Sequence, residues 1–564
     1  MDIKRTVLMV IFSMSLLILW DNWNLYNGGP SMFAPEPAPA TSASATATDK
    51  TKTDASVPQA TAPAPAAASA SGADVPGAAA ANPQGERITI TTDLLKADIN
   101  TSGGELTRVE LLKHKDGSDQ SKNVVLLESG AGRTYVGQSG LIGGNFPNHR
   151  SMFTARPGAR ALDSGDSVQL VLDAEQEGVK LTKVYTFKRG EYEIGLKHEV
   201  SNGSSAAITP SVYLQLVRDA SKLEGDSRFY STFTGPAIYT DAEKFRKVSF
   251  EDIDKNKNPA SVQTNDGWIA MVQHYFVSAF QPLDKGQHEL FTRKIDNTLY
   301  AVGAIVKIPS IAPGASASSN GKLYVGPQES VKLEQFAPDF DLVKDYGWLT
   351  IVAKPIFWLM TQIQKLLSNW GWTIIVLTIL IKLAFFPLSA ASYRSMAKMK
   401  LVTPKMTAIR ERYKGDPQQM NAAMMELYKT EKINPLGGCL PIVVQIPVFI
   451  ALYWVLLASV EMRHAPWLGW IHDLAAPDTL FGIVPGINMP VGLLPILMAV
   501  SMFVQTKLNP TPPDPVQAKV MMFMPIVFSF MFFFFPSGLV LYWVVNNLLS
   551  IGQQWVITKQ SGAA

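Results

Sequence analysis

Apolar and polar positions follow different patterns along the chain, and each pattern predicts a different structure. At the N-terminus, an apolar run over residues 7–20 follows the basic pair Lys4 and Arg5. A cleaved signal peptide begins in the same way but continues into a cleavage site of small residues, whereas Asp21-Asn22-Trp23-Asn24 follows here. The pattern favours an uncleaved signal-anchor transmembrane helix over residues 1–27, with its basic end in the cytoplasm.

Residues 86–340 contain short runs of alternating apolar and polar residues, for example at 87–90 and 192–197, separated by turn clusters such as 102–104. This period of two is typical of antiparallel strands with one buried face. We therefore expect an all-β sandwich domain, placed in the periplasm because the N-terminus is cytoplasmic. Residues 28–85, dominated by Ala, Pro, Ser and Thr, are expected to be a disordered linker because they offer little apolar surface to bury.

Residues 341–370 change to a helical period. One predicted face carries Trp348, Val352, Ile356, Leu359, Ile363 and Leu367. The opposite face carries Lys354, Thr361, Lys365 and Ser368. An amphipathic helix lying flat on a bilayer fits this pattern. A soluble helix packed on the β-domain is the alternative.

Five further apolar stretches are each long enough to suggest a membrane span: 371–388, 436–459, 480–505, 516–535 and 538–557. With the N-terminal anchor they make six predicted transmembrane helices. Pro485, Pro490 and Pro495 predict that the fourth of the six is broken or begins late, near Val491. Basic residues dominate the loop 389–435, so this loop and both termini are predicted to be cytoplasmic.

The loop 389–435 is itself predicted to form a helical hairpin. Residues 391–413 have the composition of a helix, which we expect to be interrupted at Pro404. Gly415 is placed to end it, and Asp416-Pro417 is typical of the start of a second helix over 418–431.

Composition excludes several classes of protein. With 50 basic and 47 acidic residues the net charge is only +3, which argues against sequence-specific or bulk nucleic-acid binding. The single cysteine, Cys439, excludes an intrachain disulfide and is interpreted as a small buried apolar residue. No phosphate-binding glycine loop or metal-binding spacing is present, so no cofactor or metal is expected.

Lys382 stands out because it lies within an apolar span, where a lysine costs about 2.5–3.5 kcal/mol. The predicted spans contain no Asp or Glu to pair with it. Lys382 either reaches the cytoplasmic headgroups or lines a polar cavity open to the cytosol. Thr378, one turn earlier, favours the cavity. Gln445 in the third span and several polar residues in the last span are each typical of an interhelical hydrogen bond, but together with Lys382 they suggest a groove. Those of the last span are Tyr542, Asn546, Asn547, Ser550, Gln553 and Gln554.

Large apolar side chains concentrate beside these polar positions. Phe449 lies in the third span, and Phe528 and Phe532 lie in the fifth. Plain lipid contact is as good an explanation for any one of them as a substrate-binding surface. Methionines gather in the cytoplasmic hairpin, where they would suit binding of varied apolar segments or packing of the hairpin against itself: Met396, Met399, Met406, Met420, Met424 and Met425.

Several motifs together resemble the YidC/Oxa/Alb family of membrane protein insertases. They are Ser395-Met-Ala-Lys-Met-Lys400, Lys432-Ile-Asn-Pro-Leu-Gly-Gly-Cys-Leu-Pro441, Trp470-Ile-His-Asp-Leu474 and Phe535-Pro-Ser-Gly-Leu-Val-Leu-Tyr542. The anchor and large periplasmic domain resemble the Gram-negative branch, in which that domain is a β-supersandwich like galactose mutarotase. The resemblance implies a five-helix insertase core over 371–564 with a hydrophilic groove and one central positive charge.

The resemblance also assigns roles to individual residues. Lys382 takes the place of the positive charge, where arginine is more usual, so the bidentate fork is lost. Thr378, Gln445, Trp543 and Asn546 would line the groove. The hydrophobic slide would run near Ile446, Phe449 and Phe528, with Phe532 in the same aromatic run.

The function implied is that of a non-enzymatic insertase and chaperone in the bacterial inner membrane. The implied partners are nascent membrane proteins, the ribosome, the Sec translocon and the lipid bilayer. An ion-coupled transporter is less well supported, because the spans lack acidic residues and repeated halves. An enzyme is the other alternative, and the sequence alone does not exclude sugar chemistry in the β-domain.

Overall fold

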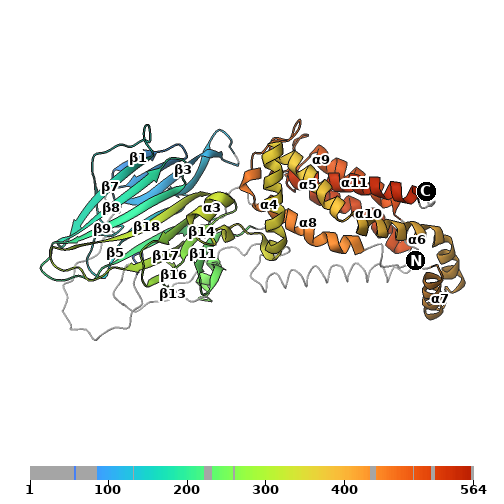
Figure 1. Ribbon diagram of the computed structural model, residues 1–564, viewed down its shortest axis with the longest axis horizontal. Helices are drawn as coiled ribbons and strands as arrows, with labels where there is room; N and C mark the ends of the chain where they lie inside the picture. The colour runs from blue at the N-terminus through green and yellow to red at the C-terminus, as the bar shows by residue number, and fades with distance from the viewer. Residues whose placement is uncertain are drawn as a thin grey trace.

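The computed structural model describes residues 56–58, 85–117, 119–130, 132–221, 232–257, 261–431, 440–486, 488–509 and 515–560. The predicted anchor over 1–27, most of the linker, Cys439 and the motif residues 432–439 lie outside this part of the chain. Figure 1 shows an elongated molecule in which a β-domain and a helical body lie end to end.

Two antiparallel sheets, each of nine strands, form the β-domain. The first sheet follows the order β1 (Arg87–Thr91), β2 (Leu95–Asn100), β3 (Glu105–Lys115), β4 (Asn123–Ser129), β5 (Thr134–Ile142), β10 (Ser211–Asp219), β17 (Leu299–Lys307), β16 (His288–Lys294) and β13 (Ser261–Thr264). The second follows the order β12 (Lys244–Lys247), β11 (Gly235–Thr240), β14 (Trp268–Val272), β15 (Phe276–Pro282), β18 (Ser316–Pro327), β9 (Glu193–Asn202), β8 (Val179–Lys188), β7 (Ser167–Gln176) and β6 (Thr154–Ala155). A short helix, α2 (Phe250–Asp254), lies between β12 and β13. The predicted β-sandwich is confirmed.

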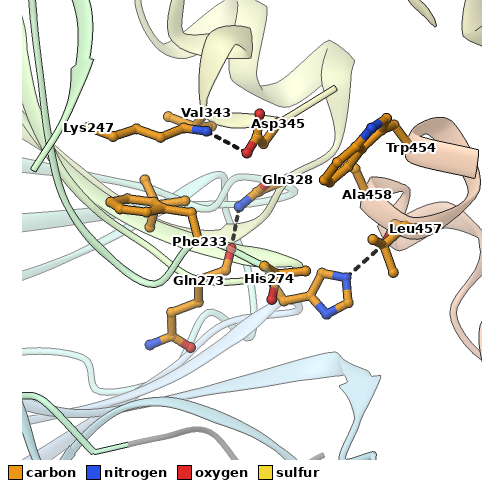
Figure 2. Close-up of a pocket in the computed structure, with 12 residues that line it drawn as sticks. Phe233, Lys247, Gln273, His274, Gln328, Val343, Asp345, Trp454, Leu457 and Ala458 are labelled. Carbon is orange, nitrogen blue, oxygen red and sulfur yellow. Dashed lines mark hydrogen bonds and ion pairs between the residues drawn. The ribbon is translucent and has the colours of Figure 1, made fainter. Parts of the chain in front are cut away.

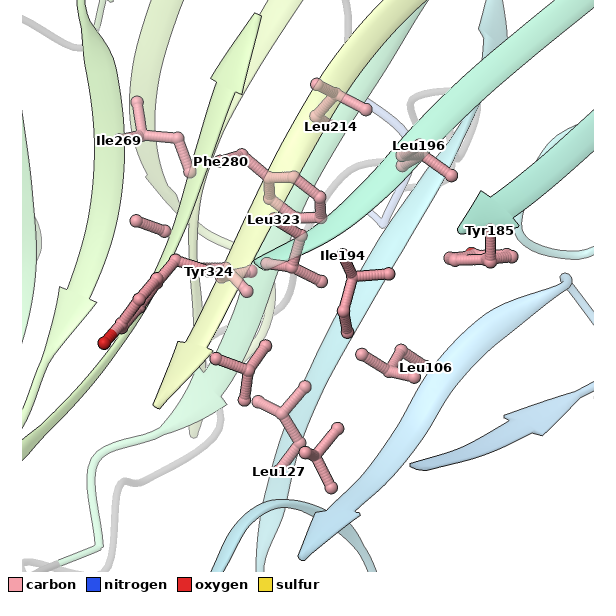
Figure 3. Packing of buried hydrophobic residues seen from close by; sticks show 14 of the residues in the cluster. Leu106, Leu127, Tyr185, Ile194, Leu196, Leu214, Ile269, Phe280, Leu323 and Tyr324 are labelled. Atoms are coloured by element: carbon pink, nitrogen blue, oxygen red, sulfur yellow. The ribbon is translucent and has the colours of Figure 1, made fainter. Parts of the chain in front are cut away.

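The alternation seen in the sequence places apolar side chains between the sheets. In β7, Val168, Leu170, Leu172 and Ala174 are all buried, while the residues between them are more exposed. Figure 3 shows the core where the two sheets meet, with Leu106 of β3 facing Ile194 of β9. Burial of this shared face is what makes the two sheets one domain.

A polar group of residues is enclosed in the same domain. Lys183 of β8 has no exposed surface, and its Nζ donates to the carbonyl oxygens of Gly103 at 2.7 Å and Ser139 at 2.8 Å. His198 Nε2 lies 2.9 Å from the hydroxyl of Ser139. Burial, with the positive charge of Lys183 nearby, lowers the pKa of His198 to about 3 and that of His149 to about 4. Both rings are therefore neutral near neutral pH.

Acidification is expected to destabilise the β-domain through these two histidines. An unfolded histidine titrates near its ordinary pKa of 6.5, well above the pKa of either folded ring. Below pH 6.5 the unfolded chain binds more protons, so the free energy of unfolding falls by up to about 1.4 kcal/mol per pH unit for each histidine. Pulse proteolysis in urea at pH 7 and pH 5 measures this, and His198→Gln should weaken the dependence. An equal urea midpoint at both pH values would contradict it.

Two short helices follow β18 and pack on the core of the β-domain: α3 (Ser330–Phe336) and η1 (Phe340–Val343). The helical body begins after them. Its elements are η2 (Gly347–Leu349), α4 (Thr350–Leu367), α5 (Trp370–Ala384), α6 (Phe386–Arg412), α7 (Pro417–Thr430), α8 (Leu440–Ala458), η4 (Val460–Met462), the short strands β19 (Ile483–Val484) and β20 (Met489–Pro490), α9 (Leu493–Leu508), α10 (Pro515–Phe532) and α11 (Ser537–Gln560). Helix α11 packs against α5, α6, α8 and α9 and so forms the centre of the body.

The helices differ from the predicted spans in instructive ways. Among the described residues, no single helix is long and apolar enough by itself to cross a membrane; α5 and α6 meet that test only as a pair, bent by 67°. The bend lies at Phe385, so the stretch 371–388 is divided rather than continuous. The sequence predicts that the fourth span, 480–505, begins late, near Val491. This prediction is confirmed, because α9 begins at Leu493.

The predicted interruption at Pro404 is wrong, because α6 continues through this residue to Arg412. A proline lacks one backbone N–H but does not always end a helix whose neighbours are well held. Here Val402 and Met406, on either side of Pro404, are buried in the hairpin. The predicted start of the second hairpin helix is confirmed: the Asp416 side chain accepts from the backbone N–H groups of Gln418 and Gln419.

Helix α4 uses its two faces differently. Four of its residues are buried in the helical core: Ala353, Phe357, Met360 and Ile363. Of these, Ile363 belongs to the apolar face predicted from the sequence, and the other three lie beside that face. Helix α4 packs chiefly against α5 and α8, which does not favour the alternative of a helix packed on the β-domain. The opposite side leaves large apolar side chains exposed: Ile351, Trp358 and Leu366. Such a surface is typical of contact with lipid.

The β-domain and the helical body meet at a polar junction, part of which Figure 2 shows. His274 Nε2 donates to the carbonyl oxygen of Leu457 at 2.8 Å, which joins the loop after β14 to the last turn of α8. Beside this contact, Lys344 Nζ lies 3.0 Å from both carboxylate oxygens of Glu461. These interactions hold the end of the β-domain against the loop that follows α8.

Candidate functional site

Lys382 lies in the last turn of α5 and is only 6% exposed. Its Nζ donates a hydrogen bond to the hydroxyl of Ser550 in α11 at 2.7 Å. The Ser550 hydroxyl in turn donates to the carbonyl oxygen of Asn546 at 2.7 Å. Within the residues that the structure describes, no carboxylate pairs with Lys382, and its one hydrogen-bond partner is the neutral Ser550 hydroxyl. The positive charge is therefore uncompensated there.

Gln445 and Asn546 extend this polar connection to a third helix. Gln445 Nε2 in α8 donates to Asn546 Oδ1 in α11 at 2.6 Å. Side chains from α5, α8 and α11 thus form one connected group: Lys382, Ser550, Asn546 and Gln445. Further along α11, Asn547 donates to Ser501 in α9 at 3.0 Å and Gln554 donates to Asn509 at 3.1 Å. The polar face of α11 thus takes part in hydrogen bonds with α5, α8, α9 and Asn509.

Thr378 is buried but does not join this group. Its hydroxyl donates to the carbonyl oxygen of Ile374, one turn earlier in its own helix, at 2.6 Å. A threonine in a helix commonly satisfies its hydroxyl in this way. Thr378 lies on the same face of α5 as Lys382, but its hydroxyl bonds to the backbone of α5 and not to Lys382 or to another helix.

Ser550 makes the contact with Lys382; the sequence placed it among the polar residues of the last span that suggest a groove, without showing which of them reaches the lysine. Its signal is its position: it follows Asn546 by four residues and so shares a helical face with it. The sequence alone could not show that this face of α11 meets the end of α5.

Trp543 belongs to the aromatic side of the site. Its ring centroid lies 4.7 Å from that of Phe449 and 5.6 Å from that of Phe532. Its indole Nε1 is buried and has no hydrogen-bond partner in the described part of the chain. Trp543 therefore separates the polar group from the phenylalanines of α8 and α10.

The four residues predicted for the hydrophobic slide do not share one environment. Ile446 and Phe528 are exposed, by 46% and 42%, and Phe449 is half-buried. Phe532 is buried against Trp543 and Phe535, so it supports this surface from behind. The exposed apolar surface continues along α10 through further residues: Phe523, Ile526, Val527 and Phe530.

The methionines of the hairpin likewise divide into two groups. Met399 of α6 and Met424 of α7 pack together with Val402 and Met406 between the helices. Met396 and Met420 are half-buried, and Met425 is 56% exposed. The hairpin therefore uses some of its methionines to pack against itself. It lies at the end of the helical body away from the β-domain (Figure 1).

Comparison with known proteins places the chain in a family. A family model described as the YidC periplasmic domain matches residues 87–359, and one described as the 60Kd inner membrane protein matches residues 362–563. The chain belongs to the YidC family. The match of residues 362–563 also shows that it is an inner membrane protein.

Named relatives agree over the whole length. The YidC-family chain is 66% identical to a protein from Janthinobacterium sp. (strain Marseille), over all of both chains. It is 64% identical to one from Herminiimonas arsenicoxydans, over 99% of each. Both relatives are named membrane protein insertase YidC. A crystal structure of an active YidC insertase with its first transmembrane domain resolved is 18% identical, with 83% of this chain and 91% of that chain covered and a TM-score of 0.37.

Proposed function

We propose that the chain is a membrane protein insertase and chaperone that uses Lys382 as the charged centre of a groove open to the cytosol. The observation that carries the proposal is a buried lysine whose Nζ donates to the neutral Ser550 hydroxyl of α11, with no carboxylate pairing with it among the described residues. Such a cation attracts an anionic group that arrives from outside the protein. Membership of the YidC family supports insertion of other membrane proteins as the task.

The proposed mechanism moves the polar and apolar parts of a client separately. A short acidic tail enters the groove and approaches Lys382, which shortens the apolar barrier that the tail has to cross. The hydrophobic segment follows the exposed surface near Ile446 and Phe528 into the lipid. Burial of its apolar surface, at about 25 cal/mol per Å², drives its release from the protein. No bond is made or broken, and no cofactor takes part.

The proposed topology has six spans, with both termini in the cytoplasm. The proposed parts are the anchor (1–27), the linker (28–85), the periplasmic domain (86–340), an interfacial helix (341–370) and the insertase core (371–564). The hairpin over 389–435 would lie in the cytoplasm, where we place contacts with ribosomes. The Sec translocon is the second proposed partner. The basic residues of the hairpin support this orientation.

Access of water to the groove tests the proposal. In a Cys439→Ser background, Asn546→Cys should react with a small maleimide added from the cytoplasmic side and not with one added from the periplasmic side. Leu539→Cys is the control, because Leu539 is 1% exposed in the apolar core near the start of α11 and should not react from either side. Reaction of Asn546→Cys from both sides would indicate a pore, and no reaction would indicate a dry site. Either result overturns the proposal.

A further inference from the structure

The first sheet of the β-domain carries a second cluster on the face turned away from the sandwich core. Along β10, Val212, Leu214 and Leu216 point into the core between the sheets, whereas Tyr213, Gln215 and Val217 alternate with them on the other face. Gln215 has no exposed surface. The outer face of β10 is therefore covered, and part of its cover comes from far away in the sequence.

The covering segment is Ser56-Val57-Pro58, from the middle of the linker. The Val57 side chain packs against the outer cluster, which contains Val136, Ile142, Tyr213, Val217, Phe291, Ala301 and Ile305. Pro58 is buried. Large apolar residues are rare in this linker, so Val57 is one of the few positions at which the linker has apolar surface to bury.

Donors from two strands bind the backbone of the same segment. Arg293 of β16 donates to the carbonyl oxygen of Ser56 at 2.7 Å and to that of Val57 at 3.0 Å. Gln215 Nε2 of β10 also donates to the Ser56 carbonyl oxygen, at 3.2 Å, and the side-chain oxygen Oε1 of Gln215 accepts from Arg293 at 3.1 Å. The Arg293 guanidinium is thus positioned by Gln215, two strands away in the sheet, and binds two successive peptide groups.

The side chain of Ser56 is recognised as well. Arg150 donates to its hydroxyl from Nη2 at 2.9 Å and from Nε at 3.2 Å. His149 Nε2 lies 3.1 Å from the same oxygen, while its Nδ1 side is turned to the hydroxyl of Tyr213. The Tyr213 hydroxyl thus orients the His149 ring toward Ser56. The contacts recognise a small hydroxyl residue followed by a β-branched residue, and the proline after them is buried.

We infer that His149, Arg150, Gln215 and Arg293 form a peptide-binding pocket on the β-domain, and that its ligand is the chain's own Ser56-Val57-Pro58. With the segment docked, residues 28–55 alone connect the anchor to the domain, and residues 59–84 become a loop that begins and ends on the domain, so the tether is shortened by about half. Because the ligand is attached, its effective concentration is high and the pocket stays occupied against other peptides. This inference is independent of the function proposed for Lys382.

The linker contains a matched control, because Val75-Pro76 repeats the Val-Pro pair without the preceding serine. In a Cys439→Ser background, Val57→Cys and Val75→Cys are compared in the full chain in spheroplasts, by reaction with a membrane-impermeant maleimide. Docking should slow the reaction at position 57 by about tenfold relative to position 75, since the thiol reacts only when the segment leaves the pocket. Equal rates at the two positions would overturn the inference.

Two further variants separate docking from the effects of the cysteine itself. Arg293→Ala removes the donor to both carbonyl groups, and Ser56→Gly alters only the ligand and leaves the folded domain unchanged. Each should raise the rate at position 57 to that at position 75, and neither should change position 75. A synthetic peptide of residues 54–60 should also raise the rate at position 57 by competition, whereas the same peptide with aspartate at position 57 should not. Rates insensitive to both variants and to the peptide would refute the pocket.

Discussion

Replacing Lys382 by glutamate is expected to reduce insertion of clients with acidic tails by about tenfold or more, because it reverses the only charge in the polar group. At an effective dielectric constant of about 20, two charges 4 Å apart interact by about 4 kcal/mol, and the substitution turns that attraction into repulsion. Lys382→Ala should give an intermediate defect, and Lys382→Arg should restore insertion. The measurement is translocation of a client with an acidic N-terminal tail, after depletion of the native protein and reconstitution with each variant.

A control for this result is Lys285→Glu, the same charge reversal at an exposed position of the β-domain, between β15 and β16. It should leave insertion close to the native level, because Lys285 lies outside the helical body that contains the polar group. A client whose tail carries no acidic residue should also be less sensitive to Lys382→Glu. If the alanine, arginine and glutamate variants all performed equally, the electrostatic part of the proposed mechanism would be lost.

Glu461→Gln is expected to destabilise the junction between the two bodies by about 3 kcal/mol. The partners of this ion pair are buried unequally: the side chain of Lys344 is 1% exposed and that of Glu461 is 21% exposed. Burial lowers the pKa of Lys344, and Glu461 opposes that effect. Removing the carboxylate leaves a buried ammonium without its counterion, whereas Lys344→Met leaves a carboxylate that water can reach. Thermal unfolding in detergent, with hydrogen exchange over residues 340–349, measures the change.

The order of the variants is the informative part of this experiment. Lys344→Met should cost less than Glu461→Gln, and the double variant should recover much of the loss, because no buried charge then remains unpaired. Glu431→Gln is the matched control: its pair with Lys405 is exposed, so the same chemical change there should cost less than about 1 kcal/mol. Equal losses from Glu461→Gln and Glu431→Gln would contradict the assignment of Lys344 as a buried charge.

Local patterns in the sequence predicted much of the fold. Alternation along strands such as β7 predicted which residues face the sandwich core, and Asp416-Pro417 predicted the start of α7. These signals act over a few residues and need no knowledge of distant contacts. Pro404 shows the limit of such signals: a proline alone favours an interruption, but packing of α7 against α6 holds the helix together.

The candidate site was predicted less completely, for a related reason. Lys382, Gln445 and Asn546 could be selected because a polar residue in an apolar span is costly wherever its neighbours lie. Which of them touch depends on how α5, α8 and α11 rotate about their axes. For this reason Thr378 bonds back to its own helix, and Ser550 provides the contact to Lys382. Phe532 is buried rather than exposed because Trp543 covers it.

The continuity of α6 through Pro404 gives the hairpin a mechanical property. This helix begins at Phe386, one turn beyond Lys382, packs against α11, and runs unbroken to Arg412. A helix of this length is a stiff rod of about 40 Å. A partner bound at the tip of the hairpin would therefore act on a stiff helix whose other end lies beside the buried cation, so that a force on the tip is transmitted to the helices around Lys382.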